Sequence, residues 1–289
     1  MATPREIRRR IRSVQNTSQI TRAMQTVSAA KMRRAQDNVL ASRAYADRIR
    51  LMIAGLYDML DADSGAFPLL ARRPVERIGV VVITADKGLA GALNSNVIRR
   101  TLSFLEANRS HETQLVTVGR RGRDFFRRTN VRRAAEFIEI GDNVSIEAIR
   151  PIIDIAITDY VEGNVDAVEL IYTEFINTLV QRPVARQLLP IEPPSDEGAE
   201  EAIRDFIFEP DQATLLEALL PRYVEVQFYQ AMLEALASEH SARMVAMRNA
   251  TDNANDLLTD LRLTYNKARQ TQITREVSEI AAGAVALTG

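Results

Sequence analysis

The residues best suited to chemistry in this chain are a short glycine turn and the lysine before it. The turn is Gly88-Leu-Ala-Gly91, and Lys87 precedes its first glycine. A glycine-rich turn after a strand can hold phosphate, but this one matches neither the G-x-G-x-x-G fingerprint nor the G-x-x-x-x-G-K-[ST] loop. We therefore expect these glycines to shape a tight strand-to-helix connection, with small-ligand binding as the less favoured alternative.

Other catalytic side chains are scarce. The absence of cysteine excludes disulfides, thiolate nucleophiles and cysteine-based zinc sites. Of the two histidines, His111 lies in a polar segment and His240 on an apolar helical stripe, where we expect a seam residue with a hydrogen-bonded ring nitrogen. Asp86 and Glu174 are candidate carboxylates without an evident partner. We predict no catalytic residue, cofactor site or metal site in this chain.

The two ends of the sequence predict the elements around which the rest is arranged. Residues 5–54 and 222–282 contain neither Gly nor Pro, which predicts helices of roughly 75 and 90 Å. The C-terminal helix carries an apolar heptad stripe, typical of a coiled coil. Its members are Leu233, Ala237, His240, Met244, Met247, Thr251, Ala254, Leu258, Leu261, Tyr265 and Ala268.

The N-terminal stripe starts at Ile7, Ile11 and Val14 and resumes from Met32 to Leu56. Polar residues interrupt it at Ser18, Thr21, Gln25 and Ser28, while Ile20, Met24 and Val27 form an offset stripe. This pattern predicts a local phase shift in an antiparallel coiled coil formed by the two terminal helices.

The predicted pair is uneven in length. If Ile53 lies opposite Val226, equal rise along both helices places Ile7 near Gln272 and leaves the residues beyond it without an intrachain partner. That overhang keeps an apolar stripe, whose members are Ile273, Val277, Ile280, Ala284 and Leu287. We expect another protein to surround this tip.

The middle of the chain predicts a small α/β head domain with a mostly parallel sheet. We expect strands at residues 77–84, 114–119, 136–140, 165–175, 180–189 and 206–208, and helices at 96–107, 121–128 and 145–161. Asp211 is expected to cap a helix over 214–220, with Pro221 at a joint before the long helix. The predicted domains are therefore 1–57 (N-terminal coiled-coil helix), 75–208 (head) and 211–289 (C-terminal coiled-coil helix and tip).

Charge is distributed unevenly along the 289 residues. The net charge is −1, yet residues 1–57 contain twelve Arg or Lys against three acids. A basic helix can bind nucleic acid, anionic lipid or an acidic protein surface, and the last is favoured because Tyr45 and Tyr57 are its only aromatic residues. The apolar runs fall short of the ~20 residues that span a bilayer.

Several segments together resemble the γ subunit of F-type ATP synthases, bacterial type, over essentially the whole chain. They are Arg8-Arg-Arg-Ile-Arg-Ser-Val-Gln-Asn-Thr17, Gln19-Ile-Thr-Arg-Ala-Met24, Ala29-Ala-Lys-Met-Arg33, Thr84-Ala-Asp-Lys-Gly-Leu-Ala-Gly-Ala-Leu-Asn94, Ala242-Arg-Met-Val-Ala-Met-Arg248, Ala250-Thr-Asp-Asn253 and Tyr265-Asn-Lys-Ala-Arg-Gln270. The cysteine-bearing insertion of photosynthetic γ subunits is missing, so thiol regulation is not expected.

The resemblance implies a rotor subunit of the central stalk. Its partners would be the α and β subunits around the coiled coil, and the ε subunit and the c-ring at the head. It would be peripheral, on the cytoplasmic face of a bacterial inner membrane, with no nucleic acid bound and with catalysis left to β. The contacts with β that the resemblance implies are Met24, Lys31, Arg33, Arg34, Arg243, Arg269, Gln270 and Thr274.

Two alternatives stay open from the sequence alone. One is a nucleotide- or phosphate-binding α/β enzyme with a helical arm, which would hydrolyse ATP by itself. The other is a basic coiled-coil adaptor for nucleic acid, whose binding would be sensitive to salt.

Overall fold

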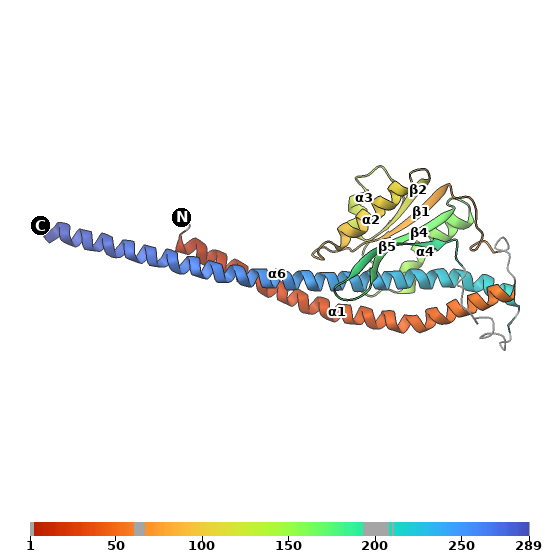
Figure 1. Ribbon diagram of the computed structural model, residues 1–289, viewed down its shortest axis with the longest axis horizontal. Coiled ribbons are helices and arrows are strands. Elements are labelled where there is room, and N and C mark those ends of the chain that lie inside the picture. The colour runs from red at the N-terminus through yellow and green to blue at the C-terminus, as the bar shows by residue number, and fades with distance from the viewer. Residues whose placement is uncertain (1–2, 61–66, 193–207, 210, 289) are drawn as a thin grey trace. The chain divides into compact units, whose positions relative to one another are not determined.

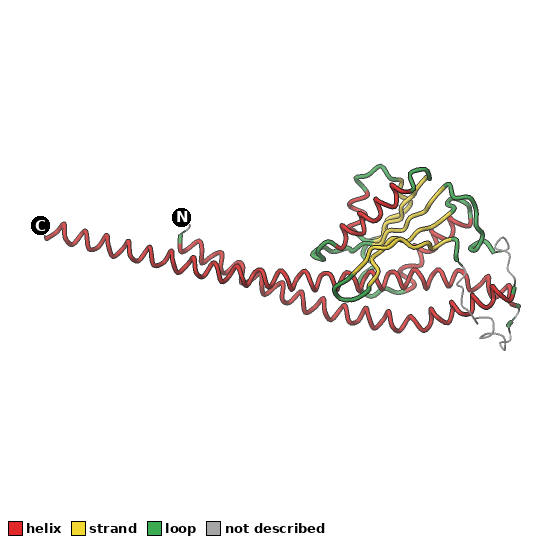
Figure 2. The backbone as a smooth tube through the Cα atoms, in the orientation of Figure 1, coloured by secondary structure: helices red, strands yellow, loops and turns green. Residues whose placement is uncertain are grey.

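The computed structural model describes residues 3–60, 67–192, 208–209 and 211–288. It divides into two compact units: unit 1 comprises Met1–Ser28 and Met244–Gly289, and unit 2 comprises Ala29–Arg243. Two long helices, α1 (Pro4–Met59) and α6 (Gln212–Thr288), contribute to both units (Figures 1 and 2).

Unit 1 is an antiparallel helix pair, as the heptad stripes predict. Arg8 of α1 hydrogen-bonds the Tyr265 hydroxyl of α6, and its guanidinium lies 5.4 Å from the Tyr265 ring centroid. Further along, Ser18 Oγ donates to Asn255 Oδ1 at 3.1 Å. On the α6 side, the buried residues Met247, Thr251, Ala254 and Leu258 follow the predicted seam.

The predicted phase shift in α1 is wrong. The seam keeps its heptad phase through polar residues: Thr21 and Ser28 are buried, while Ile20 and Val27 are 60% and 53% exposed. The Thr21 and Thr251 hydroxyls hydrogen-bond each other across the pair at 2.7 Å. Because these hydroxyls are satisfied, a polar layer can occupy a position that usually holds an apolar side chain.

The predicted register is also wrong, by six residues. Arg8 meets Tyr265, whereas the predicted offset placed it near Thr271. The cause lies at the start of α6, where Pro221 was expected to interrupt the helix. In the structure α6 is continuous from Gln212 through Pro221, and the Gln212 side chain lies 3.8 Å from the Met59 sulfur at the end of α1.

Burial explains why Pro221 is tolerated inside a helix. A proline there costs about 3 kcal/mol because it removes a backbone hydrogen bond and crowds the preceding turn. Leu216, Leu220 and Val224 on the same stretch are almost fully buried in the core of unit 2. Full burial of each side chain contributes about 1.5–3 kcal/mol, which offsets that cost.

Unit 2 contains the α/β head domain, in which a five-stranded sheet has the order β3-β2-β1-β4-β5. Its elements are β1 (Arg77–Ile83), α2 (Leu93–Ala107), β2 (Glu112–Val118), α3 (Arg120–Phe126), β3 (Arg132–Phe137), α4 (Ile146–Val161), β4 (Ala167–Phe175) and β5 (Gln181–Leu189). All neighbouring strands are parallel except the antiparallel pair β4 and β5, so the predicted mostly parallel sheet is confirmed.

Both faces of the sheet are covered, which the continuous apolar run of β1 requires. Val80 and Val82 pack on one side with residues of α2 and α3. Val81 and Ile83 face the opposite side, in a larger cluster that includes α4 and the unit 2 parts of α1 and α6 (Figure 1). The helices α1 and α6 are thus part of the core of the head as well as of the pair in unit 1.

Most predicted elements of the head are present, with shifted boundaries. The strand predicted at 136–140 lies instead at Arg132–Phe137, because the chain turns at Glu139, whose φ is 60°. Ser145 caps α4 by accepting from the Ala148 amide, as predicted. The strand expected at 206–208 lies largely outside the described residues.

Candidate functional site

Three loops of the head meet α6 along residues 238–243, which we call the anchor segment. These loops follow β1, β3 and β4, whose carboxyl ends lie at one edge of the sheet because the strands are parallel. In open α/β sheets this edge is where ligands usually bind. Here a helix of the same chain occupies it.

The β1–α2 loop is held by Arg243. Its guanidinium nitrogens Nε and Nη2 each donate to the Gly88 carbonyl at 3.2 Å, and Nη2 also pairs with Glu239 one turn earlier on α6. Arg243 is only 7% exposed, so these contacts are shielded from water. Burial raises the pKa of Glu239, and the adjacent Arg243 charge opposes that rise.

The glycine turn itself adopts a strained backbone. Leu89 and Gly91 have φ values of 63° and 57°, in the left-handed region that glycine tolerates best. Asn94 stabilises the turn by accepting from the Ala85 amide at 2.9 Å. The turn is thus a tight strand-to-helix connection, as predicted.

The β4–β5 hairpin contacts the anchor segment through two serines. Ser238 donates to the Thr173 carbonyl at 3.2 Å, and Ser241 donates to the Thr178 carbonyl at 2.7 Å. Gln181 completes the contact by donating to the Ser241 hydroxyl at 3.4 Å. Both serines are fully buried, so these hydrogen bonds are shielded from water.

The β3–α4 loop contributes Asp142, which lies between α1 and α6. Lys31 of α1 forms an ion pair with one Asp142 oxygen, and His240 Nε2 of α6 lies 3.5 Å from the other. Burial raises the pKa of Asp142, but the Lys31 hydrogen bond and the charges of His240, Lys31 and Lys87 bring it below its ordinary value. Asp142 is therefore ionised at neutral pH.

His240 is neutral in this environment. Burial lowers its pKa to about 4, although the Asp142 charge acts in the opposite direction. The predicted hydrogen bond to a ring nitrogen is wrong: neither nitrogen has a hydrogen-bond partner within the described residues. The 3.5 Å contact with Asp142 becomes an ion pair only when the imidazole is protonated.

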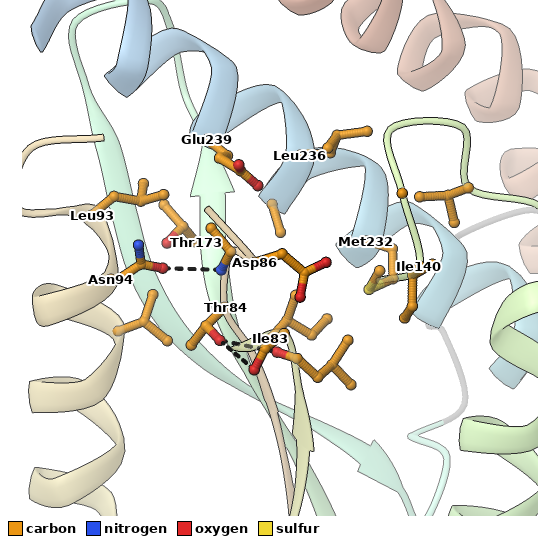
Figure 3. Close-up of a pocket in the computed structure, with 17 residues that line it drawn as sticks. Ile83, Thr84, Asp86, Leu93, Asn94, Ile140, Thr173, Met232, Leu236 and Glu239 are labelled. Carbon is orange, nitrogen blue, oxygen red and sulfur yellow. Dashed lines mark hydrogen bonds between the residues drawn. The ribbon is translucent and has the colours of Figure 1, made fainter. Parts of the chain in front are cut away.

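A cavity of about 50 Å³ remains between the strand ends and α6 (Figure 3). Met232, Leu236 and Glu239 of α6 line one side of it, and Thr84 and Asn94 lie on the head side. Ligand pockets usually measure ~300–1,000 Å³, so this one is too small for a nucleotide. Among the described residues no group of three or more His, Asp or Glu side chains is arranged to hold a metal ion.

The candidate carboxylates have structural roles. Asp86 accepts from the backbone amides of Arg120 and Glu139 at 2.9 and 3.0 Å, which fixes the loops after β2 and β3. Glu174 pairs with Arg182 and Arg186 on β5. Both carboxylates are thus engaged by backbone amides or by arginines of the head.

The predicted contact residues fall into two groups. Arg33 and Arg34 in unit 2, and Arg269, Gln270 and Thr274 in unit 1, are exposed, while Met24 in unit 1 is half-buried. Lys31 and Arg243 are instead engaged inside unit 2, with Asp142 and with Glu239 and Gly88. Arg243 is buried, so a partner would reach its charge only if these contacts opened, whereas Lys31 stays partly exposed.

The predicted tip is a single helix in unit 1. Ile273, Val277 and Ile280 are 46%, 59% and 73% exposed. Ala284 and Leu287 lie within α6, but their side chains are outside the description. None of the described helices combines the length and apolar character of a membrane span.

Fold and site together define a class of protein in which long terminal helices carry an α/β head domain. The carboxyl-terminal edge of the sheet, where ligands usually bind, is covered by α6 of the same chain, and α6 carries an exposed apolar stripe near its C-terminal end.

A family model described as ATP synthase matches residues 3–287. The ATP synthase gamma chain of Chloroflexus aurantiacus is 52% identical with full coverage of both chains. That of Pelotomaculum thermopropionicum is 46% identical over 99% of this chain and 100% of the relative. The chain belongs to the ATP synthase gamma chain family, and the resemblance noted in the sequence is confirmed.

Solved structures agree with this assignment. A central stalk and c-ring structure of the Tetrahymena thermophila mitochondrial ATP synthase contains a chain with a TM-score of 0.61 and 26% identity, covering 80% of this chain and 99% of that one. A chain in the Euglena gracilis mitochondrial enzyme has a TM-score of 0.68 at 19% identity, covering 98% and 94%. The second likeness supports the fold alone.

Proposed function

We propose that this chain is the central-stalk rotor of an ATP synthase. It couples ion-driven rotation of the membrane c-ring to sequential conformational changes at the catalytic β sites, where ATP is made. Beyond the family membership, the observation that carries this function is the exposed apolar stripe on the unpaired end of α6 in unit 1. An exposed apolar stripe of this kind usually marks an interaction surface.

The proposed role needs no catalytic group in the chain. A rotor acts by making different contacts with successive conformations of β, because a partner with equal affinity for every state shifts none of them. The exposed residues Arg33, Arg34, Arg269, Gln270 and Thr274 are the groups that we assign to these contacts, together with the half-buried Met24. The α and β subunits would surround unit 1, with Ile273, Val277, Ile280, Ala284 and Leu287 as the bearing surface.

The head would contact the ε subunit and the c-ring. Association with the membrane would then be indirect, through the complex, on the cytoplasmic face of a bacterial inner membrane. The nucleotide-binding alternative has little support, since the cavity at the strand ends is about 50 Å³ and α6 closes it.

Reconstitution tests this proposal. The purified chain is mixed with its cognate α and β subunits, and co-elution and ATPase activity are measured, with each component alone as a control. We expect a stoichiometric complex whose turnover depends on this chain. Absence of a complex, together with ATP hydrolysis by the chain alone, would overturn the rotor assignment.

A further inference from the structure

We propose that the anchor segment is the junction through which the head domain transmits torque to α6, with Asp142 and Arg243 as its positioning residues. This inference rests on the proposed rotor function and assigns to it a specific place in the chain. All of the contacts involved lie within unit 2.

The distribution of the contacts around α6 is the first argument. Successive residues of a helix are about 100° apart around its axis. From Ser238, Arg243 is then about 140°, His240 about 200° and Ser241 about 300° around the helix. The hairpin and the glycine turn therefore hold α6 from different directions, and the Asp142 loop packs beside His240 on a third, so α6 cannot turn about its axis relative to the head without disrupting some of these contacts.

The type of contact is the second argument. Ser238, Ser241 and Arg243 are buried and donate to backbone carbonyls of the head. A buried hydrogen bond is costly to break because its partners cannot turn to water instead. Backbone carbonyls in short loops also move less than side chains. A torque on the head is therefore transmitted to α6 with little movement of one relative to the other.

Asp142 extends the junction to the second long helix. Its ion pair with Lys31 links the β3–α4 loop to α1, while the same carboxylate lies beside His240 of α6. Both side chains of the ion pair are about 40% exposed, so the pair contributes only ~0–1 kcal/mol to stability. Its loss should therefore loosen the junction without unfolding the head.

A loosened variant tests the proposal. Asp142→Ala combined with Arg243→Lys removes the link to α1 and the double contact with the Gly88 carbonyl, but leaves a positive charge beside Glu239. A matched control, Glu112→Ala with Arg132→Lys, makes the same types of change in an exposed ion pair at the β2–β3 edge of the head. Circular dichroism checks that both variants are folded.

Two activities separate torque transmission from assembly. ATP hydrolysis by the complex with α and β alone does not require torque from the head, whereas ATP synthesis in proteoliposomes with the full complex does. For the loosened variant we expect the ratio of synthesis to hydrolysis to fall by about 2- to 30-fold, the range of coupling changes that such substitutions cause. The control variant should keep the wild-type ratio.

A covalent link provides the rescue. Because the chain has no cysteine, Thr178→Cys with Ser241→Cys adds a single pair where the Ser241 hydroxyl lies 2.7 Å from the Thr178 carbonyl. In the loosened background, oxidation should restore the ratio and reduction should abolish the gain. A wild-type complex treated with oxidant and reductant controls for the other subunits.

The outcomes distinguish the two proposals. If the wild-type chain neither assembles nor supports synthesis, the rotor function itself fails. If the wild type is active and the loosened variant keeps its ratio, the junction is overturned. A fall in the ratio that a confirmed disulfide does not reverse also overturns it, because Asp142 and Arg243 would then act through contacts outside the junction.

Discussion

At the scale of single residues, His240 shows how position decides chemistry. Elsewhere a histidine beside an aspartate could relay protons, but this one is 2% exposed and neutral, with a pKa of about 4. The groups that face it are Asp142, Lys31, Lys87 and Arg243, three of them positive. The surroundings therefore disfavour an imidazolium despite the neighbouring carboxylate.

The lowered pKa of His240 predicts a dependence of stability on pH. The unfolded chain binds a proton at this histidine below about pH 6.5, whereas the folded chain binds it only near pH 4. Stability from this residue is therefore present above pH 6.5 and is lost as the pH falls towards 4, by up to about 1.4 kcal/mol per pH unit. Urea unfolding of the wild type and of His240→Gln at pH 7.5 and 5 measures the effect.

The wild type must be compared with His240→Gln because Glu169 changes the stability with pH in the opposite direction from His240. Burial raises its pKa to about 7, so the folded chain gains stability from Glu169 as the pH falls through that range. Glu169 is the same in both proteins and cancels in the difference. An equal loss of stability in the wild type and His240→Gln between pH 7.5 and 5 would contradict the assignment.

Arg269 and Gln270 are the residues for which contact with β is expected to matter most. Both are exposed in unit 1, so Arg269→Ala with Gln270→Ala should change the stability of the free chain by less than about 0.5 kcal/mol. Coupling or ATP synthesis should fall, because two polar contacts with β are lost. Arg248→Ala with Asn249→Ala, also exposed in unit 1, is the matched control. Wild-type synthesis in the first variant would remove these residues from the mechanism.

At the scale of elements, the polar layer between Thr21 and Thr251 specifies how α1 and α6 pair in unit 1. Single polar residues in a coiled-coil seam favour one register at some cost in stability. Each hydroxyl has one proton and a backbone carbonyl in reach as an alternative acceptor, that of Met247 at 2.8 Å for Thr251 and that of Ser18 at 3.1 Å for Thr21. Either hydroxyl thus retains a backbone acceptor if its partner is lost.

Valine substitutions test this layer. Thr21→Val alone should destabilise the chain by about 0.5–1.5 kcal/mol, while Thr21→Val with Thr251→Val should be neutral or stabilising, because two apolar groups of the same shape then face each other. Thermal unfolding followed at 222 nm, analysed as a double-mutant cycle, gives the coupling between the two positions. Additive effects would show that the cross-helix hydrogen bond contributes nothing.

The elements themselves were largely predictable, and their pairing was not. Periodicity located both long helices and the strand that includes Val81, because burial imposes a period of 3.6 or 2 on the sequence. The register failed because Pro221 gave a local signal for a break that packing of the surrounding leucines overrode. Ser238, Ser241 and Asp142 were missed, since their importance depends on loops far away in the sequence; two serines spaced three apart on an apolar helix face were the only available hint.

At the scale of the whole molecule, the end of α6 in unit 1 exposes an apolar stripe to solvent in the free chain. Residues 269–278 are exposed all around the helix, and the apolar stripe among them contributes nothing to the stability of the free chain. On the proposed function, a partner in the complex would cover this stripe, in keeping with membership in the ATP synthase gamma chain family.

Removing the tip tests this dependence. A chain that ends at Gln272 should keep the unfolding temperature of the full chain. Surface changes of this kind alter the free energy of unfolding by no more than ~0.5 kcal/mol. Its complex with α and β should be weaker or turn over more slowly, as measured by co-elution and ATPase activity. Replacing Ile273, Val277 and Ile280 by serine keeps the length and should have the same effect. A lower unfolding temperature of the free truncated chain would mean that the tip packs on its own protein.

The uneven lengths of α1 and α6 also have a mechanical consequence. Two packed helices resist bending and twisting better than one, so the stiffness of α6 drops where its partner ends, after Tyr265 meets Arg8. Beyond that point the helix is the most compliant part of unit 1 and behaves as a short elastic rod. A ring of subunits around it would have to keep the helix centred as well as receive force from it. Part of each rotational step would then be stored briefly as elastic deformation of a single helix.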